Sequence, residues 1–195
     1  QYEVIMYNRT YREIDLKAIE YNFDLLSQKV SEGVKKCAVI KADAYGHGAV
    51  PVARVLESKA DYFAVACFDE AMELRQAGIK LPVLVLSYIR PDYFGEAVEN
   101  DITATLYTLE DALMLNKAAE EKGKKAKAHI ALDTGMSRIG FPLNDASAEI
   151  IRKIKKLTKY MILQKDIKSF YLIARQRGSV LSISRRKLKA EDLLV

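Results

Sequence analysis

The chain has 195 residues, 50% of them hydrophobic, and a net charge of +5. This length and apolar content are sufficient for one domain with a sizeable core, and they exclude a fibrous or disordered chain. The longest apolar runs, such as "LPVLVLS" at 81–87, are far shorter than the roughly 18 residues of a membrane-spanning helix.

The start of the chain lacks the basic segment, apolar stretch and cleavage site of a secretory signal. We therefore expect a cytoplasmic protein with no membrane partner.

The positive charge is concentrated at the end of the chain. Residues 159–195 hold 9 basic and 3 acidic residues, which leaves 22 basic and 23 acidic residues before them. The first 158 residues are thus nearly neutral. The tail has little aromatic interleaving and matches no nucleic-acid-binding module, so we expect no nucleic-acid partner.

Two cysteines, Cys37 and Cys67, each lie in an apolar stretch. Two cysteines form neither a disulfide framework nor a metal-site spacing. The sequence therefore predicts two small buried thiols, and no metal site.

Short apolar runs rich in β-branched residues alternate with amphipathic helical patterns. We expect strands near 13–15, 37–41, 62–66, 82–87, 103–107 and 128–133. Two helical faces follow the spacing of three and four residues: Leu16, Ile19, Phe23, Leu26 and Val30, then Ala49, Val52, Ala53 and Leu56.

The helix ends carry their own signals. Thr108 with Asp111 three residues later is typical of a helix start, and Gly123 of the end of that helix. Asp69 is a candidate cap for the helix that ends near Gly78.

Apolar strands that alternate with helices indicate parallel pairing with both faces covered, in an open doubly wound sheet or a closed barrel. No Gly-x-Gly-x-x-Gly turn follows any strand, and Lys41 lies at the carboxyl end of a strand, where (β/α) barrels place their chemistry. Five or six units cannot close an eight-stranded barrel. We therefore predict an α/β fold, a partial (β/α)8 TIM-type barrel.

A lysine at the mouth of an apolar barrel loses part of its hydration, which favours the neutral amine. A neutral amine can attack an aldehyde, and pyridoxal phosphate is the common aldehyde cofactor. Gly46 and Gly48 allow a tight loop before the next helix, whose first amides could receive a phosphate, and Tyr45 offers a hydroxyl. On spacing alone, a solvated Lys41 and simple loop packing of Tyr45 and His47 remain alternatives.

Three segments resemble the alanine racemase family. "VIKADAYGHGAVPVARVLE" at 39–57 is similar to its cofactor-lysine signature, "YREIDLKAIEYNFDLL" at 11–26 to its opening strand and helix, and "HIALDTGMSRIGF" at 129–141 to its Asp-Thr-Gly-Met-x-Arg-x-Gly-Phe segment. The three occur in the family's order over roughly 150 residues.

The resemblance implies a pyridoxal-phosphate barrel followed by a C-terminal β-domain, paired head to tail in a homodimer, with alanine as the substrate. Lys41 would hold pyridoxal 5'-phosphate as a Schiff base and act as the catalytic base on one face of the α-carbon. Tyr45 would bind the cofactor phosphate. Arg138 would lie near the cofactor's phenolic oxygen and the substrate carboxylate.

The sequence departs from the family in three places. Ala131 stands where many members carry a lysine that, as a carbamate, supports the arginine. The chain ends before the C-terminal domain, from which the partner subunit supplies a tyrosine as the second base. Beyond Leu157 the family's Ser-His-Phe strand is replaced by "KSFYLIARQRGSVLSISRRK".

We therefore divide the chain into 1–158, the N-terminal part of the barrel, and 159–195, a divergent basic tail. Our hypothesis for the tail is a reading-frame shift near residues 160–168, which sequencing of the coding DNA tests. The expected function is an alanine racemase, in a form with little or no activity alone. The alternatives are a non-catalytic pyridoxal-phosphate-binding barrel and an inert relic.

Overall fold

The computed structural model describes residues 12–157, 159–163 and 171–173. Its elements, in chain order, are α1 (Leu16–Ser27), β1 (Lys36–Val39), α2 (Lys41–Gly46), α3 (Ala49–Leu56), β2 (Tyr62–Val65), α4 (Phe68–Gln76), β3 (Val83–Val85), the 3-10 helix η1 (Pro91–Tyr93), α5 (Phe94–Glu99), β4 (Ile102–Leu106), α6 (Leu109–Glu121), β5 (Ala126–Ile130), α7 (Asp145–Ile154), β6 (Met161–Leu163) and β7 (Tyr171–Ile173).

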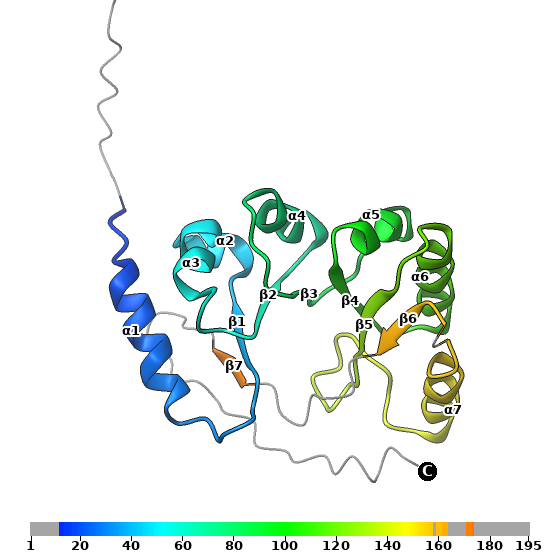
Figure 1. The fold of residues 1–195 in the computed structure, drawn as a ribbon. Coiled ribbons are helices and arrows are strands. Elements are labelled where there is room, and N and C mark those ends of the chain that lie inside the picture. Colours follow the sequence, from blue (N-terminus) through cyan, green and yellow to red (C-terminus); the bar gives the residue numbers. More distant parts are fainter. Residues whose placement is uncertain (1–11, 158, 164–170, 174–195) are drawn as a thin grey trace, which may run out of the picture.

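The described strands form a single parallel sheet in the order β6-β5-β4-β3-β2-β1-β7. The helices lie along the outer side of this curved sheet, and β6 and β7 stand at its two edges (Figure 1). Strands that pair with their successors through crossover helices are the repeating unit of a (β/α) barrel. The prediction of a partial TIM-type barrel is confirmed.

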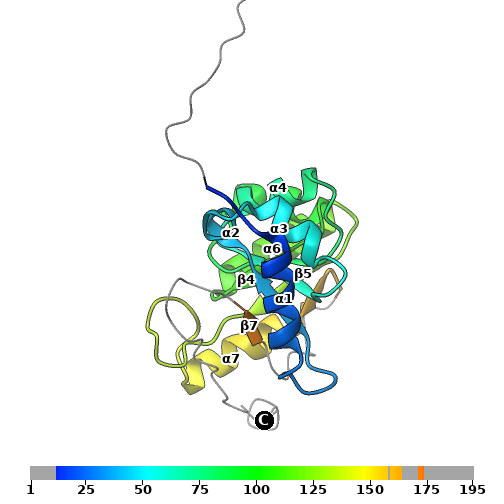
Figure 2. The same ribbon diagram turned by 90° about the vertical axis from the view of Figure 1, so that its left-hand side faces the viewer.

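The strand expected at 13–15 is wrong. These residues form no regular element, and Asp15 instead caps α1, where its side chain accepts a hydrogen bond from the Ala18 amide at 3.1 Å. A cap requires a residue just outside the helix. The α1 helix itself, blue in Figure 2, runs along the side of the barrel and buries Phe23.

Side chains alternate between the two faces of the sheet, as the pleat requires. One face packs against the helices and forms the main core, which includes Phe63, Val65, Val83 and Leu106. The opposite, inner face carries a smaller cluster made of Cys37, Val39, Tyr62, Ala64 and Leu84. We call this second set the inner cluster, because it lines the concave side of the barrel.

The predicted signals at α6 are confirmed. The Thr108 side chain accepts a hydrogen bond from the Asp111 amide at 3.0 Å, and Gly123 ends the helix with φ of +61°. The cap predicted at Asp69 is wrong. The α4 helix begins at Phe68, so its cap position is Cys67 and Asp69 lies inside the first turn.

The two cysteines lie in different surroundings. Both are free thiols. Cys37 is buried in the inner cluster, and burial raises the pKa of its thiol to about 12. Cys67 is exposed, so the prediction of two buried thiols is wrong for this residue. The residues of β2 are buried, but Cys67 lies beyond the end of this strand.

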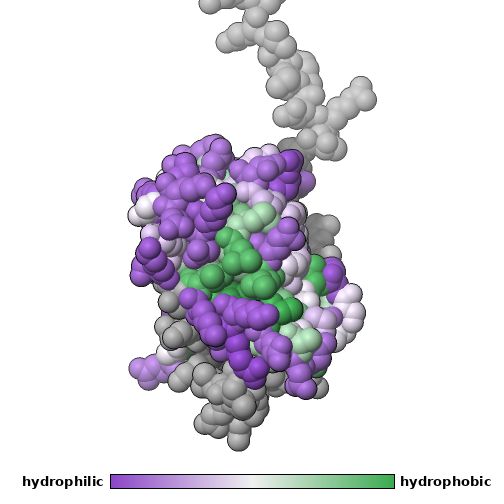
Figure 3. Space-filling view, turned by 90° about the vertical axis from the view of Figure 1, so that its right-hand side faces the viewer, coloured by the Kyte–Doolittle hydropathy of each residue, from purple (hydrophilic) through white to green (hydrophobic). Residues whose placement is uncertain are grey.

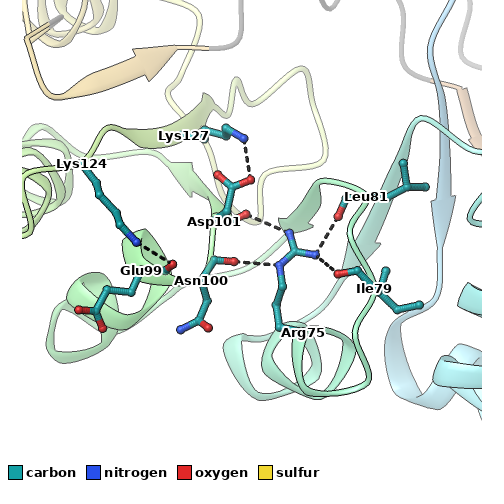
Figure 4. Close-up of polar contacts among 8 residues, drawn as sticks. All are labelled: Arg75, Ile79, Leu81, Glu99, Asn100, Asp101, Lys124 and Lys127. Atoms are coloured by element: carbon teal, nitrogen blue, oxygen red, sulfur yellow. Dashed lines mark hydrogen bonds and ion pairs between the residues drawn. The ribbon is translucent and has the colours of Figure 1, made fainter.

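Arg75, near the end of α4, joins the loops at the amino ends of β3 and β4 (Figure 4). Its guanidinium donates to the carbonyls of Ile79 (2.9 Å), Leu81 (2.8 Å), Asn100 (2.8 Å) and Asp101 (3.0 Å). Burial lowers the pKa of Arg75. These bonds satisfy carbonyls that lie outside the strand ladders.

The face of the molecule that carries α6, α7 and β6 displays an apolar patch (Figure 3). Ile162 of β6 is 41% exposed, and Leu113 of α6 is 49% exposed. Within the described part of the chain, β6 pairs on one side only, with β5. No helix in this part is long and apolar enough to cross a membrane.

Candidate active site

Lys41 stands where β1 ends. The preceding residue, Ile40, donates a hydrogen bond from its amide to the Ala64 carbonyl of β2 at 2.9 Å, which is the last contact of this ladder. Lys41 is half-buried. The parallel strands therefore deliver its amine to the carboxyl edge of the sheet, as the sequence predicts.

The backbone after Lys41 turns in the left-handed sense. Ala42, Asp43, Ala44 and Tyr45 all have φ between +50° and +56°. For L-residues this conformation costs about 1–2 kcal/mol each, so four in succession require compensating contacts. We call residues 42–45 the left-handed turn.

Hydrogen bonds within and around the left-handed turn supply these contacts. The Ala44 amide donates to the Ile40 carbonyl and the Gly48 amide to the Asp43 carbonyl, both at 2.9 Å. The Asp43 carboxylate accepts from the Ala49 amide at 2.7 Å. Each bond crosses the turn or ties it to α3, so the conformation is held from several directions.

Asp43 changes one expectation from the sequence. The first amides of α3 were expected to be open to a phosphate, but the Ala49 amide is occupied by the Asp43 carboxylate. A carboxylate at a helix start also takes the position that an anion would favour. The Ala49 amide is therefore not open to a phosphate.

Tyr45 extends from the left-handed turn toward the concave side and packs against the inner cluster. It is half-buried, and burial raises the pKa of its phenol. The hydroxyl thus stays protonated and can donate a hydrogen bond. His47, by contrast, is exposed and its Nδ1 lies 2.8 Å from the Ala44 carbonyl oxygen, which matches the alternative of loop packing for this residue.

A second loop follows β5 and carries Arg138. The Asp133 carboxylate accepts hydrogen bonds from the amides of Gly135 and Ser137, both at 2.9 Å, and these backbone bonds lower the pKa of Asp133. Gly140 has φ of +118°, and a Cβ there would lie 2.7 Å from the Asp133 nitrogen. The sequence Asp-Thr-Gly-Met-Ser-Arg-Ile-Gly therefore folds into a tight loop that only glycine at 140 permits.

Arg138 is exposed in this loop and makes no hydrogen bond or ion pair with any other described residue. Its guanidinium is thus available to an anionic ligand. At Ala131, one of the positions where the sequence departs from the resemblance, the carbonyl accepts a hydrogen bond from the Phe141 amide at 2.9 Å.

The three expected site residues share one edge of the sheet. Lys41 and Tyr45 follow β1 and Arg138 follows β5, and parallel strands end on the same side. Figure 2 shows α2 and the loop after β5 on the same side of the molecule. In the described part of the chain, this common edge relates the three residues, and no hydrogen bond joins them.

Sequence reasoning missed Glu70. Its carboxylate accepts hydrogen bonds from the Ala42 amide at 2.8 Å and from the Ala66 amide at 2.7 Å. The available signal was the spacing of Cys67 and Glu70, a helix cap position followed three residues later by an acid.

A cavity of about 360 Å³ lies elsewhere, at the amino ends of β1 and β2. Its lining includes Ser27, Gly33, Lys36 and Asp61. It is therefore separated from Lys41 by the length of β1, and we do not assign the site to it.

The fold and these residues define a class of protein: a parallel (β/α) barrel segment that presents a lysine amine, a phenol and a guanidinium at its carboxyl edge. The family described as alanine racemase, N-terminal domain, matches residues 14–166. The chain belongs to this family. The match extends past Leu157, where the resemblance drawn from the sequence stopped.

Relatives and solved structures agree with this assignment. The chain is 48% identical over 146 residues to an alanine racemase of Methanococcus maripaludis, covering 74% of this chain and 39% of that protein. It is 46% identical over 146 residues to alanine racemase 2 of Caldanaerobacter subterraneus, covering 74% of this chain and 38% of that protein. A solved alanine racemase of Clostridium difficile 630 superposes with a TM-score of 0.75 at 43% identity, covering 82% of this chain and 41% of that structure.

The chain thus spans about two fifths of the length of the curated relatives that it matches. The matched part carries Lys41, Tyr45 and Arg138.

Proposed function

We propose that the protein is a pyridoxal-phosphate-dependent alanine racemase in which Lys41 holds the cofactor. The observation that carries the proposal is the position of Lys41: a half-buried amine at the carboxyl end of a barrel strand, followed by the left-handed turn that carries Tyr45. Relatives at 46–48% identity bear the name alanine racemase.

The residues present fit this cofactor. Lys41 supplies an amine at the carboxyl end of a barrel strand, and a lysine amine is the group that forms a Schiff base with an aldehyde. The Tyr45 hydroxyl is a donor for a phosphate oxygen, and the Arg138 guanidinium can bind a carboxylate or a phenolic oxygen. When bound, pyridoxal phosphate supplies an aldehyde and a conjugated ring that accepts electrons from the substrate's α-carbon.

Each residue then has a separate role. Arg138 binds the carboxylate of the amino acid and orients its α-carbon. Tyr45 holds the cofactor phosphate. Lys41 takes the α-proton from its own face in one direction of the reaction, and in the reverse direction it delivers a proton to that face. Racemisation also needs a second acid-base group on the opposite face, and the resemblance implies a tyrosine from a partner subunit of a homodimer.

Three further proposals accompany this function. Residues 1–158 form the N-terminal part of the barrel, 159–195 form a tail of different origin, and the protein acts in the cytoplasm. Most of residues 159–195 lie outside the described residues.

The test is a titration of the full chain with pyridoxal phosphate, followed by borohydride reduction and peptide mapping, with the variants Lys41→Ala and Lys17→Ala. Lys17 is an exposed lysine of α1 and serves as the matched control. We expect an absorbance band and a reduced adduct at Lys41 in the wild type and in Lys17→Ala. Lys41→Ala should show neither.

Equal labelling of surface lysines in all three proteins would contradict the proposal and favour the inert relic. If Lys41 is labelled but no alanine is racemised at any protein concentration, the non-catalytic cofactor-binding barrel is favoured.

A further inference from the structure

The ends of β1 and β2 are bridged by one side chain from α4. Glu70 accepts the Ala42 amide on one carboxylate oxygen (2.8 Å) and the Ala66 amide on the other (2.7 Å). Ala42 directly follows Lys41, and Ala66 directly follows β2. Glu70 thus connects the backbone of the candidate cofactor lysine to the neighbouring strand.

The Ala42 amide needs such a partner. Ala42 is the first residue of the left-handed turn, with φ of +50° and ψ of +53°, and it is exposed. A left-handed residue is held only where the surroundings fix it. The other bonds of the turn involve Ala44, Asp43 and Gly48, and none of them is made by the residue next to Lys41.

The two hydrogen bonds of Glu70 differ in the elements that they connect. The Ala66 bond lies four residues from Glu70 and resembles the bond by which an acid near a helix start satisfies a preceding amide. The Ala42 bond spans 28 residues and joins α4 to another βα unit. Only the second bond has consequences for the direction of the lysine side chain.

We propose that Glu70 is a positioning residue for Lys41: its carboxylate fixes the Ala42 amide, and thereby the direction in which the Lys41 amine leaves β1. This inference rests on the proposed function for its chemical consequence. The hydrogen-bond bridge itself does not depend on that function.

The experiment compares Glu70→Gln with Glu73→Gln in the full chain. Glu73 is an exposed residue of the same helix and gives a matched change of charge. Glutamine can accept only one of the two amides, because its NH2 group is a donor. We measure the rate of borohydride-trapped labelling of Lys41 by pyridoxal phosphate, divided by the rate at the exposed Lys17.

The labelling ratio should fall about tenfold in Glu70→Gln. A Lys41 amine that points in the wrong direction reacts with the aldehyde over a higher activation barrier. The ratio should stay unchanged in Glu73→Gln. Circular dichroism must show that the Glu70→Gln variant is folded, because unfolding would lower the labelling of Lys41 without changing that of the exposed Lys17. An unchanged ratio in a folded Glu70→Gln would overturn the inference.

A second measurement uses the wild type without cofactor, in case Glu70→Gln does not fold. Hydrogen exchange at the Ala42 amide should be slower than in an unstructured peptide by at least about tenfold, because the amide is bonded although the residue is exposed. Exchange at the peptide rate would also overturn the inference. Absence of Lys41 labelling in the wild type, with a protected Ala42 amide, would contradict only the proposed function.

Discussion

His129 of β5 is a half-buried imidazole on the concave side of the barrel. Its ring meets the ring of Tyr62, an inner-cluster residue, edge to face at a centroid distance of 6.1 Å. Burial, and to a smaller extent the charge of Lys35, lowers its pKa from 6.5 to about 4. The fold therefore favours the neutral imidazole.

This preference predicts a pH dependence of stability. Above pH 6.5 the ring is neutral in both the folded and the unfolded chain, so the contribution of His129 to stability is fully present. As the pH falls from 6.5 toward 4, the unfolded chain binds a proton that the folded chain excludes, and the free energy of unfolding decreases by up to about 1.4 kcal/mol per pH unit. Urea denaturation at a series of pH values measures this slope.

The control exploits the fact that the chain has only two histidines. His129→Gln should remove this part of the slope, whereas a change of the exposed His47 to Gln should retain it. A wild-type slope that persists unchanged in His129→Gln would contradict the assignment.

At the same scale, the candidate site was predictable only in part. Lys41, Tyr45 and Arg138 lie in motifs with a fixed order, so the sequence alone makes them candidates. Glu70 binds two backbone amides. Because almost any residue offers a backbone amide, the side chains of Ala42 and Ala66 give no sign of this contact. Such a residue becomes visible only when the strands are placed side by side.

At the scale of elements, Arg75 connects two βα units through their backbones. It donates to four carbonyls, two before β3 and two before β4. We expect Arg75→Ala to lower the free energy of unfolding by about 2–4 kcal/mol, because hydrogen bonds from a charged group are lost and half-buried carbonyls lose their partner.

Chemical denaturation monitored by circular dichroism measures this effect. Arg54→Ala is the matched control, since Arg54 is an exposed residue near the end of α3. Its change should stay within about 0.5 kcal/mol. An equal decrease in the free energy of unfolding for the two variants would show that water replaces the four hydrogen bonds of Arg75 without cost.

The elements also show which local signals are reliable. Thr108 and Gly123 marked the ends of α6 correctly, because a cap depends on a few neighbouring atoms. The apolar residues Ala49, Val52, Ala53 and Leu56 are all buried, as their spacing indicated. The strand predicted at 13–15 was wrong. A strand forms only where another strand pairs with it, and a local sequence pattern does not show whether such a partner exists.

At the scale of the whole molecule, the edge at β6 predicts self-association. Ile162 is 41% exposed on a strand that pairs on one described side only. Unpaired strand edges with apolar side chains favour association between chains. We expect Ile162→Glu to lower the average mass measured by light scattering at high protein concentration.

Leu113→Glu serves as the control, because Leu113 is similarly exposed, at 49%, but lies on a helix. It should leave the average mass nearly unchanged. If both substitutions lower the mass equally, general surface hydrophobicity and not the strand edge drives the association.

The architecture as a whole was the most predictable feature. Alternation of apolar strands with amphipathic helices restricts the chain to a few parallel folds, and the position of Lys41 selects the barrel among them. The edge strands β6 and β7 were not expected, since they do not continue the regular spacing of the preceding strands.

The strand order has a consequence for how the chain acquires its structure. From β1 to β6 every strand pairs with the next one in sequence, so each pairing requires closure of a short segment only. The β1–β7 pairing differs, because it joins Lys36 to Tyr171 across most of the chain. Closure entropy grows with the length enclosed. The pairings from β1 to β6 therefore each carry a small entropic cost of closure, whereas the β1–β7 pairing carries the largest cost of any pairing in the described sheet.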